Sequence, residues 1–254
     1  DFKAEEYGMD KPFIRKQDLF TQYGVAAAYQ AMKQAGLVSQ GEGQNIDPFR
    51  LGVYFGSGIG GFATQYREIA KMIEDPSGQW ISPLFIPTMI SNIAAGHIAI
   101  MHHAEGPCLD IVTACATSTN AMGEAFRAIR NGYADAIITG GCENATIPIG
   151  IVGFANAKAL SRATNPKYAS LPFNANRAGF VMADGSAALV LEEYEHAKAR
   201  GAQILGEMVG YGNTCDAYHS TAPRPDGTTQ AKCIELALEE AGFDKDKDNL
   251  YINA

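Results

Sequence analysis

Short apolar runs alternate along the chain with longer segments whose apolar residues recur at helical spacing. The apolar runs predict buried strands, and turn residues separate them from the segments that follow. The predicted strands cover "RLGVYFG" (50–56), "CLDIVTA" (108–114), "ADAIITGG" (134–141), "AALVLEEY" (187–194), "QILGEMVGYG" (203–212) and "NLYINA" (249–254).

The segments between these strands predict helices. In 117–131 the apolar residues Met122, Ala125 and Ile129 share one helical face, and Gly132 stands where a helix would end. A loop interrupted by proline leads into another helix within 82–104. The other predicted helices cover 20–37, 63–75, a segment ending near Gly201, and 228–242.

The order strand, helix, strand over 108–141 predicts a parallel crossover within a sheet covered on both faces. The whole pattern is typical of an α/β protein with a mixed sheet. With 254 residues the chain is long enough for one large domain or two modest ones.

Composition narrows the function. The formal net charge is −8, which argues against a nucleic-acid partner. Five cysteines form no CxxC pair, so we expect reduced thiols in the cytoplasm, with neither a disulfide framework nor a metal site. The charged first residues predict no signal peptide. The most apolar run, 89–101, is too short to span a membrane and contains Asn92 and His97.

A glycine-rich turn follows the strand at 50–56. Gly56, Gly58 and Gly61 match the G-x-G-x-x-G pattern that can bind a dinucleotide. That fingerprint needs an acidic residue at the end of a following strand, whereas Glu74 and Asp75 end a predicted helix. We therefore prefer a tight turn in which backbone passes close to backbone or ligand.

One cysteine differs from the others by its position. Cys115 falls where a predicted strand ends and a helix begins, so backbone N–H groups and the helix dipole favour a thiolate there. Its neighbours are small, which would let a bulky substrate reach the sulfur. The segment suits a nucleophile with part of an oxyanion hole, although a buried structural thiol is the alternative.

The segment "DIVTACATSTNAMGEAFRAIRNGYADAIITGGCE" (110–143) resembles the active-cysteine region of the β-ketoacyl-acyl-carrier-protein synthases, closest to the type II enzymes of fatty-acid elongation. The resemblance extends through "FTQYG", "GSGIGG", "AGHIAI", "GFANAKALS", "GFVMADGSAALVLEEYEHAKARGA", "VGYGNTCDAYH" and "YINA". It implies a thiolase-like αβαβα layered fold with mixed sheets and a homodimer. It also implies an acyltransferase that elongates an acyl chain by Claisen condensation with malonyl carrier protein.

The resemblance assigns roles to single residues. Cys115 matches the acylated nucleophile. Ile59, Gly150 and Phe154 match positions that line the acyl pocket, although plain core packing is the alternative. The basic positions that meet the acidic acyl carrier protein are matched by Arg15, Lys16 and Lys158. No dissociable cofactor is implied, because the phosphopantetheine arm belongs to the carrier.

The resemblance also implies parts that the 254 residues do not contain. We expect 1–254 to hold the cysteine-bearing N-terminal half and the start of the C-terminal half. The first strand and the segment with two histidines and a lysine would lie outside, so the chain alone should be inactive in condensation. Of its own histidines, we expect His97 in the core or at an interface, His102 and His103 in solvent, and only His219 on a loop that could approach Cys115.

Three other functions stay open. A polyketide-type ketosynthase shares the same chemistry and differs in its substrates. A partner subunit that sets chain length would typically lack the nucleophile, so Cys115 argues against it. A catalytically incomplete fragment is the third.

Overall fold

The computed structural model describes residues 2–253. The chain divides into two compact units, Asp1–Ala202 and Gln203–Ala254, which are described separately below. Within the described residues, no helix combines the length and apolar character needed to cross a membrane.

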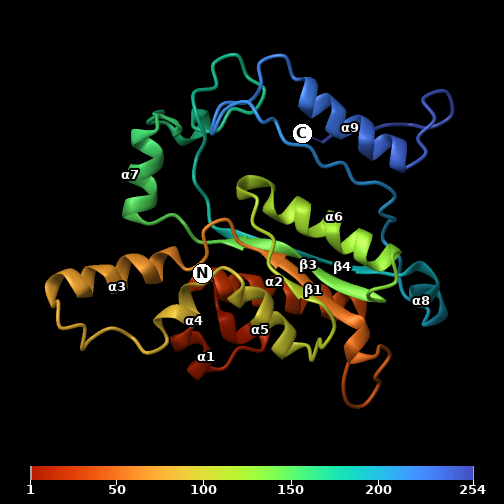
Figure 1. The fold of residues 1–254 in the computed structure, drawn as a ribbon, viewed down its shortest axis with the longest axis horizontal. Coiled ribbons are helices and arrows are strands. Elements are labelled where there is room, and N and C mark those ends of the chain that lie inside the picture. Colours follow the sequence, from red (N-terminus) through yellow and green to blue (C-terminus); the bar gives the residue numbers. More distant parts are fainter. Residues whose placement is uncertain (1, 254) are drawn as a thin grey trace. The chain divides into compact units, whose positions relative to one another are not determined.

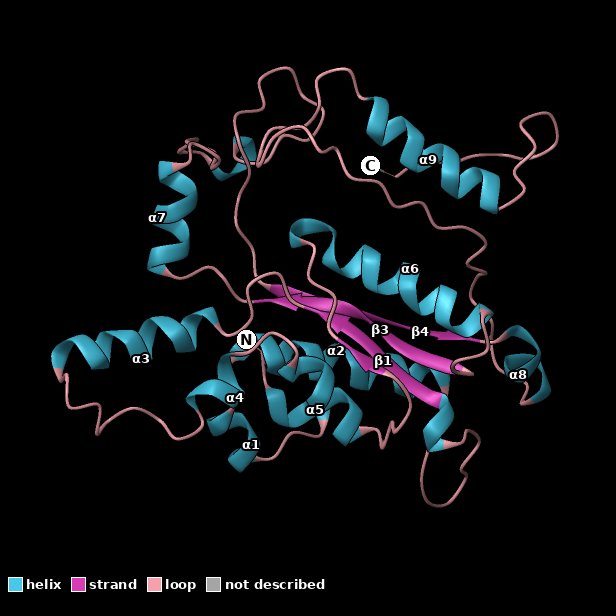
Figure 2. Ribbon diagram, in the orientation of Figure 1, coloured by secondary structure: helices cyan, strands magenta, loops and turns pink. Residues whose placement is uncertain are grey.

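The first unit is built around a four-stranded mixed sheet with the strand order β2-β1-β3-β4. Strand β1 (Leu51–Gly56) pairs in parallel with β2 (Cys108–Leu109) and with β3 (Ala136–Glu143). Strand β4 (Gly185–Glu192) pairs antiparallel with β3. Figure 2 shows β1, β3 and β4 side by side at the centre of the unit. The mixed sheet predicted from the sequence is confirmed.

Helices cover both faces of this sheet (Figure 1). Helices α2 (Leu19–Ala35) and α5 (Ile93–Met101) pack on one face, together with Val53 and Phe55 of β1. Helix α6 (Thr117–Arg130) packs on the other face, and Tyr54 contributes to its core. Because successive side chains of a strand point to opposite faces, the uninterrupted apolar run of β1 serves both layers.

Both ends of α2 are capped, and further helices and single turns complete the first unit. Helix α2 begins at the N-cap Asp18, whose carboxylate accepts from the N–H of Phe20, and ends at Gly36 with φ of 64°. The other helices are α1 (Lys11–Lys16), α3 (Phe62–Glu74), α4 (Phe85–Met89), α7 (Pro148–Asn156) and α8 (Tyr194–Ala199). Single 3₁₀ turns cover Ala4–Tyr7, Pro48–Arg50, Ala114–Ala116 and Pro166–Tyr168.

The second unit contains helix α9 (Thr228–Glu240) and long connecting segments. Gly210 and Gly212 lie so close to this helix that a side chain at either would overlap the carbonyl oxygens of Ala237 and Cys233. The carboxylate of Glu240 accepts from the N–H of Tyr211 at 2.8 Å, which joins the helix to the segment before it.

Three strand predictions need correction. The segments 203–212 and 249–253 form no strand, and Ala254 lies outside the described residues. A strand needs a neighbouring strand to pair with, and the described part of the second unit offers none. The predicted buried strand 108–114 is reduced to β2, which is exposed at the sheet edge. The predicted helices are all present, most within two residues of their expected ends.

Candidate active site around Cys115

Cys115 lies in the 3₁₀ turn Ala114–Ala116, which runs directly into α6 at Thr117. The side chain is exposed. Ala114 has φ of +52°, a left-handed conformation that non-glycine residues rarely adopt and that costs of order 1 kcal/mol. The sequence prediction that Cys115 immediately precedes a helix is therefore confirmed, and the turn presents its thiol at the positive end of that helix.

Polar side chains of α6 hold this turn. The hydroxyl oxygen of Thr117 accepts a hydrogen bond from the N–H of Thr113 at 2.9 Å. The hydroxyl of Thr113 lies 2.6 Å from Oδ1 of the buried Asn120, to which it donates. These bonds replace capping by Ala116, whose methyl group has no polar atom.

The glycine-rich loop 56–61 packs against the same turn. A side chain at Gly56 would overlap the carbonyl oxygen of Ile111 and the methyl group of Thr117, so only glycine fits there. Protein acceptors occupy two N–H groups of the loop: Gly58 donates to Glu143, and Gly60 donates to Ser57. These N–H groups are not available to a phosphate, which supports the tight turn over a dinucleotide site.

The predicted acyl-pocket residues occupy two neighbouring segments. Ile59 lies in the glycine-rich loop and is 39% exposed. Gly150 and Phe154 lie on α7, and the Phe154 ring meets the Phe180 ring edge to face at 5.3 Å. A side chain at Gly150 would overlap the carbonyl oxygen of Ala145. Their role as an acyl pocket stays a prediction.

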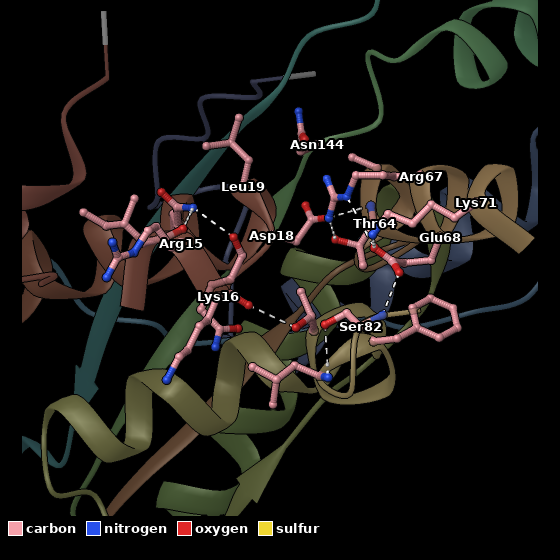
Figure 3. Close-up of a pocket in the computed structure, with 17 residues that line it drawn as sticks. Arg15, Lys16, Asp18, Leu19, Thr64, Arg67, Glu68, Lys71, Ser82 and Asn144 are labelled. Carbon is pink, nitrogen blue, oxygen red and sulfur yellow. Dashed lines mark hydrogen bonds and ion pairs between the residues drawn. The ribbon is translucent and has the colours of Figure 1, made fainter. Parts of the chain in front are cut away.

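Two of the three predicted carrier-binding residues lie together. Arg15 and Lys16, in the last turn of α1, line a cavity of about 660 Å³. Arg67 and Lys71 of α3 line it as well (Figure 3). Lys158 is not part of this cavity: it follows α7, which lies away from α1 in Figure 1. Of the three predicted residues, only Arg15 and Lys16 therefore share this cavity.

Two carboxylates inside this cavity neutralise part of its positive charge. Asp18 accepts from the N–H and the hydroxyl of Thr64 at 2.9 and 2.6 Å. Glu68 accepts from Nζ of Lys71 at 2.7 Å. Burial opposes the ionised form of Glu68, but the hydrogen bonds and positive charges around it leave its pKa below the usual value. Arg67 and Lys71 each lie within 4 Å of Glu68. By contrast, Arg15 and Lys16 form no ion pair among residues 2–253 and are open to an acidic partner.

The sequence prediction overlooked Arg67, Lys71 and Glu143. Arg67 and Lys71 lie four positions apart in a helix that the sequence did predict, so their shared face could have been read from the spacing. Glu143 could have been noticed only as an acidic residue at the end of a buried apolar strand.

The predictions for the three histidines have different outcomes. The His97 ring packs against the Phe13 ring at 4.9 Å and is half-buried, and burial lowers the pKa of its imidazole. This fits a position at the margin of the core, and the interface alternative stays a prediction. The prediction that His102 is solvated is wrong: burial lowers the pKa of its imidazole to about 4, because the charged form loses its hydration. His219 belongs to the second unit, where Nδ1 accepts from the N–H groups of Thr221 and Ala222. Its predicted approach to Cys115 is untested.

The first unit combines a mixed sheet between helical layers with an exposed thiol in the turn before α6. This arrangement fits the thiolase-like fold that the sequence resemblance implies. Comparison with known proteins agrees. Residues 1–197 match the family "Beta-ketoacyl synthase, N-terminal domain" and residues 205–254 match "Beta-ketoacyl synthase, C-terminal domain". The chain belongs to the beta-ketoacyl synthase family.

Curated relatives in this family are similar over the whole chain. The 3-oxoacyl-[acyl-carrier-protein] synthase 2 of Vibrio cholerae is 45% identical over 254 residues, and that of Synechocystis is 45% identical over 255. In both comparisons 100% of this chain is covered. The chain spans 60% of the length of each relative.

Solved structures confirm the predicted fold class. A beta-ketoacyl synthase from Burkholderia phymatum superposes with a TM-score of 0.81 at 33% identity, covering 92% of this chain and 56% of that one. A type II polyketide ketosynthase, AntDE, solved in complex with its acyl-carrier protein AntF, gives a TM-score of 0.83 at 33% identity. That match covers 89% of this chain and 56% of the other.

Proposed function

We propose that the protein containing this chain is a condensing acyltransferase. It takes an acyl chain from acyl carrier protein onto Cys115 and elongates it by decarboxylative Claisen condensation with malonyl carrier protein. The observation that carries this proposal is the exposed Cys115 thiol in a left-handed turn at the start of α6. Family membership supports it, because the matched relatives are 3-oxoacyl-[acyl-carrier-protein] synthases.

The proposed chemistry has two half-reactions. The Cys115 thiolate attacks the carbonyl carbon of the acyl carrier thioester, the carrier sulfur leaves as a thiolate, and an acyl-Cys115 thioester remains. The carrier thiolate then takes up the proton that Cys115 released to the solvent. Malonyl carrier protein then loses CO₂. The resulting carbanion attacks the acyl carbonyl, a carbon–carbon bond forms and the Cys115 sulfur leaves as thiolate. The start of α6 favours the negative charge in both steps.

The proposed substrate is carried by an acidic protein. Arg15 and Lys16 suit such a partner because they place positive charge on a chain of net charge −8. Lys158 stays a separate predicted contact with the carrier protein, because it does not line the cavity of Arg15 and Lys16. The cytoplasmic location predicted from the unpaired cysteines also stays a prediction.

The proposed assembly is a homodimer. Strand β2 is an edge strand, and its own Leu109 and the following Val112 are 49% and 50% exposed. An apolar sheet edge of this kind is a liability unless another chain or segment covers it. A second copy of the protein would cover it, and sedimentation of the purified protein tests this directly.

A polyketide-type ketosynthase is the second candidate, and the likeness to the AntDE ketosynthase favours it. Both functions use the same thiol and differ in the acyl group that Cys115 accepts. Competition between saturated acyl carriers of increasing length and polyketide-loaded carriers separates them. Preference for the saturated chains supports the fatty-acid function. Preference for the polyketide chains supports the polyketide function instead.

The proposed function is tested by acylation. The protein is mixed with acyl-loaded carrier protein, and its intact mass is followed beside a Cys115→Ala variant. The expected result is a gain of one acyl group only when Cys115 is present. A second arm reverses the charge of Arg15 and Lys16, which should slow acylation most at low salt. Equal mass gain in both proteins would exclude Cys115 as the nucleophile.

A further inference from the structure

The carboxylate of Glu143 reaches from the end of β3 to the glycine-rich loop. Its Oε1 accepts from the hydroxyl of Ser57 at 3.0 Å, and its Oε2 accepts from the N–H of Gly58 at 2.8 Å. Hydrogen bonds to an ionised acceptor are about twice as strong as neutral ones. Both oxygens of one carboxylate thus hold two adjacent residues of the loop.

Ser57 extends this connection further along the loop. Its hydroxyl oxygen accepts from the N–H of Gly60 at 2.9 Å, and the side chain is only 1% exposed. Burial raises the pKa of Glu143, although the bonds from Ser57 and Gly58 work against this shift. Asp184 is the nearby like charge and raises that pKa too. Hydrogen bonds from the loop hold the carboxylate in this partly buried position.

The loop held by Glu143 is in contact with the Cys115 turn. A Cβ placed on Gly58 would lie 2.7 Å from Oε2 of Glu143 and 3.7 Å from the carbonyl oxygen of Ala114. The position directly beside Gly58 therefore lies between the carboxylate and the residue before Cys115. The far end of the loop is fixed where the N–H of Gly61 donates to the Met89 carbonyl at 2.9 Å.

We propose that Glu143 is a positioning residue that fixes the loop 57–60 against the Cys115 turn. By doing so it sets the position of Ile59, which the proposed function assigns to the wall met by a chain attached at the Cys115 sulfur. The acyl nature of that chain rests on the proposed function; the geometric role of Glu143 does not. Glu143 touches neither the thiol nor the reacting atoms, and it acts through the loop.

The test compares two reagents that alkylate the same thiol. Iodoacetamide reports on Cys115 alone, whereas N-octyl iodoacetamide must also place an alkyl chain against the loop. Both rates are measured at Cys115 by peptide mapping in the unaltered protein, in Glu143→Gln, in Ser57→Ala and in the double variant. Glu124→Gln is the matched control, because Glu124 is a half-exposed carboxylate of α6 paired with Arg127.

Glutamine keeps the size of Glu143 but replaces one acceptor oxygen by an amide that donates. The expected result is a fall in the ratio of octyl to plain alkylation of roughly tenfold in Glu143→Gln. Ser57→Ala should lower the ratio by less, and the double variant should fall no further than Glu143→Gln. Glu143→Asp, which keeps the charge, should restore part of the ratio. Glu124→Gln should leave it unchanged.

Two results overturn the proposal. One is an unchanged ratio in Glu143→Gln. The other is a parallel fall of both rates together with the thermal midpoint, which assigns Glu143 a purely structural role. No carrier protein is used, so loss of the proposed acyl transfer leaves this test intact. The ratio can fall as expected even if Cys115 accepts no acyl carrier.

Discussion

The turn at the start of α6 and the end of strand β3 place the same side chain in opposite surroundings. Cys115 is exposed in a left-handed turn, with the N-terminal end of a helix behind it. Cys142 is 5% exposed and lies against α2, where a Cβ on Gly24 would be 3.1 Å from its sulfur. Burial, followed by the charge of Glu143, raises the pKa of Cys142 well above its usual value.

The difference teaches that surroundings, not residue type, decide what a thiol does. A buried thiol without a cation beside it remains protonated and acts as a small apolar side chain. A thiol at a helix start has backbone donors nearby and room for a reagent. The two regions lie at the same end of neighbouring elements, so variants in each can be compared in one protein.

The largest expected effect separates the two thiols by activity. Cys115→Ser should lower acyl transfer by a factor of roughly a thousand or more, because the nucleophile itself is replaced. Cys142→Ser should retain acyl transfer in the folded protein. Rates are measured with acyl carrier protein, and circular dichroism checks that both variants fold. Equal losses of acyl transfer in the two variants would contradict different roles for the two thiols.

A second effect concerns the packing beneath the turn. Gly56→Ala should destabilise the protein by about 1–3 kcal/mol, because the added methyl group overlaps Ile111 and Thr117. Gly96→Ala in α5 is the matched control, since a Cβ there meets no atom within 4 Å. That control should be stabilising, because alanine is the better helix former. Urea denaturation measures both, and the same sign in both would contradict the packing described.

A third effect concerns stability at the Cys142 site. Cys142→Ser should cost about 1–2 kcal/mol, because a buried hydroxyl loses more hydration than a thiol does, even with the backbone N–H of Gly24 beside it. Cys142→Ala is the control and should cost less, since it removes the sulfur without adding a polar atom. Urea midpoints of the two variants give the comparison. A serine variant more stable than the alanine variant would argue against an apolar surrounding.

The smallest effect is the pH dependence of the same site. The folded protein keeps the Cys142 proton, whereas the unfolded thiol loses it above pH of about 8.5. Ionisation of Cys142 in the unfolded state therefore leaves the free energy of unfolding unchanged well below that pH and lowers it as the pH rises. Between pH 8 and 9 it should lower the free energy of unfolding by about 0.5–1 kcal/mol. In Cys142→Ala the free energy of unfolding should fall less between pH 8 and 9. An equal fall in that variant would assign the pH dependence to other groups.

The sequence predicted the elements whose signals are local. Helix α6 was expected over 117–131 and is found over Thr117–Arg130, because its apolar spacing and Gly132 are contained within one segment. Strand pairing is not local. The segment 203–212 has the composition of a strand but no strand to pair with in its unit, and composition cannot show that.

The candidate site was predictable only in part for the same reason. Cys115 was identified from its place between two elements, which the nearby residues determine. The contact between Glu143 and Gly58 joins residues 85 positions apart, and no single stretch of sequence carries it. The separation of Lys158 from Arg15 and Lys16 likewise depends on where α7 lies in the folded chain.

The most direct test of the central claim is the position of the acyl adduct. The protein is incubated with acyl carrier protein, quenched, digested and mapped by mass spectrometry at all five cysteines. The account predicts the acyl group on the peptide containing Cys115, with Cys142 unmodified until the protein is unfolded. An acyl group on another cysteine, or none on Cys115 while acyl transfer proceeds, would contradict it.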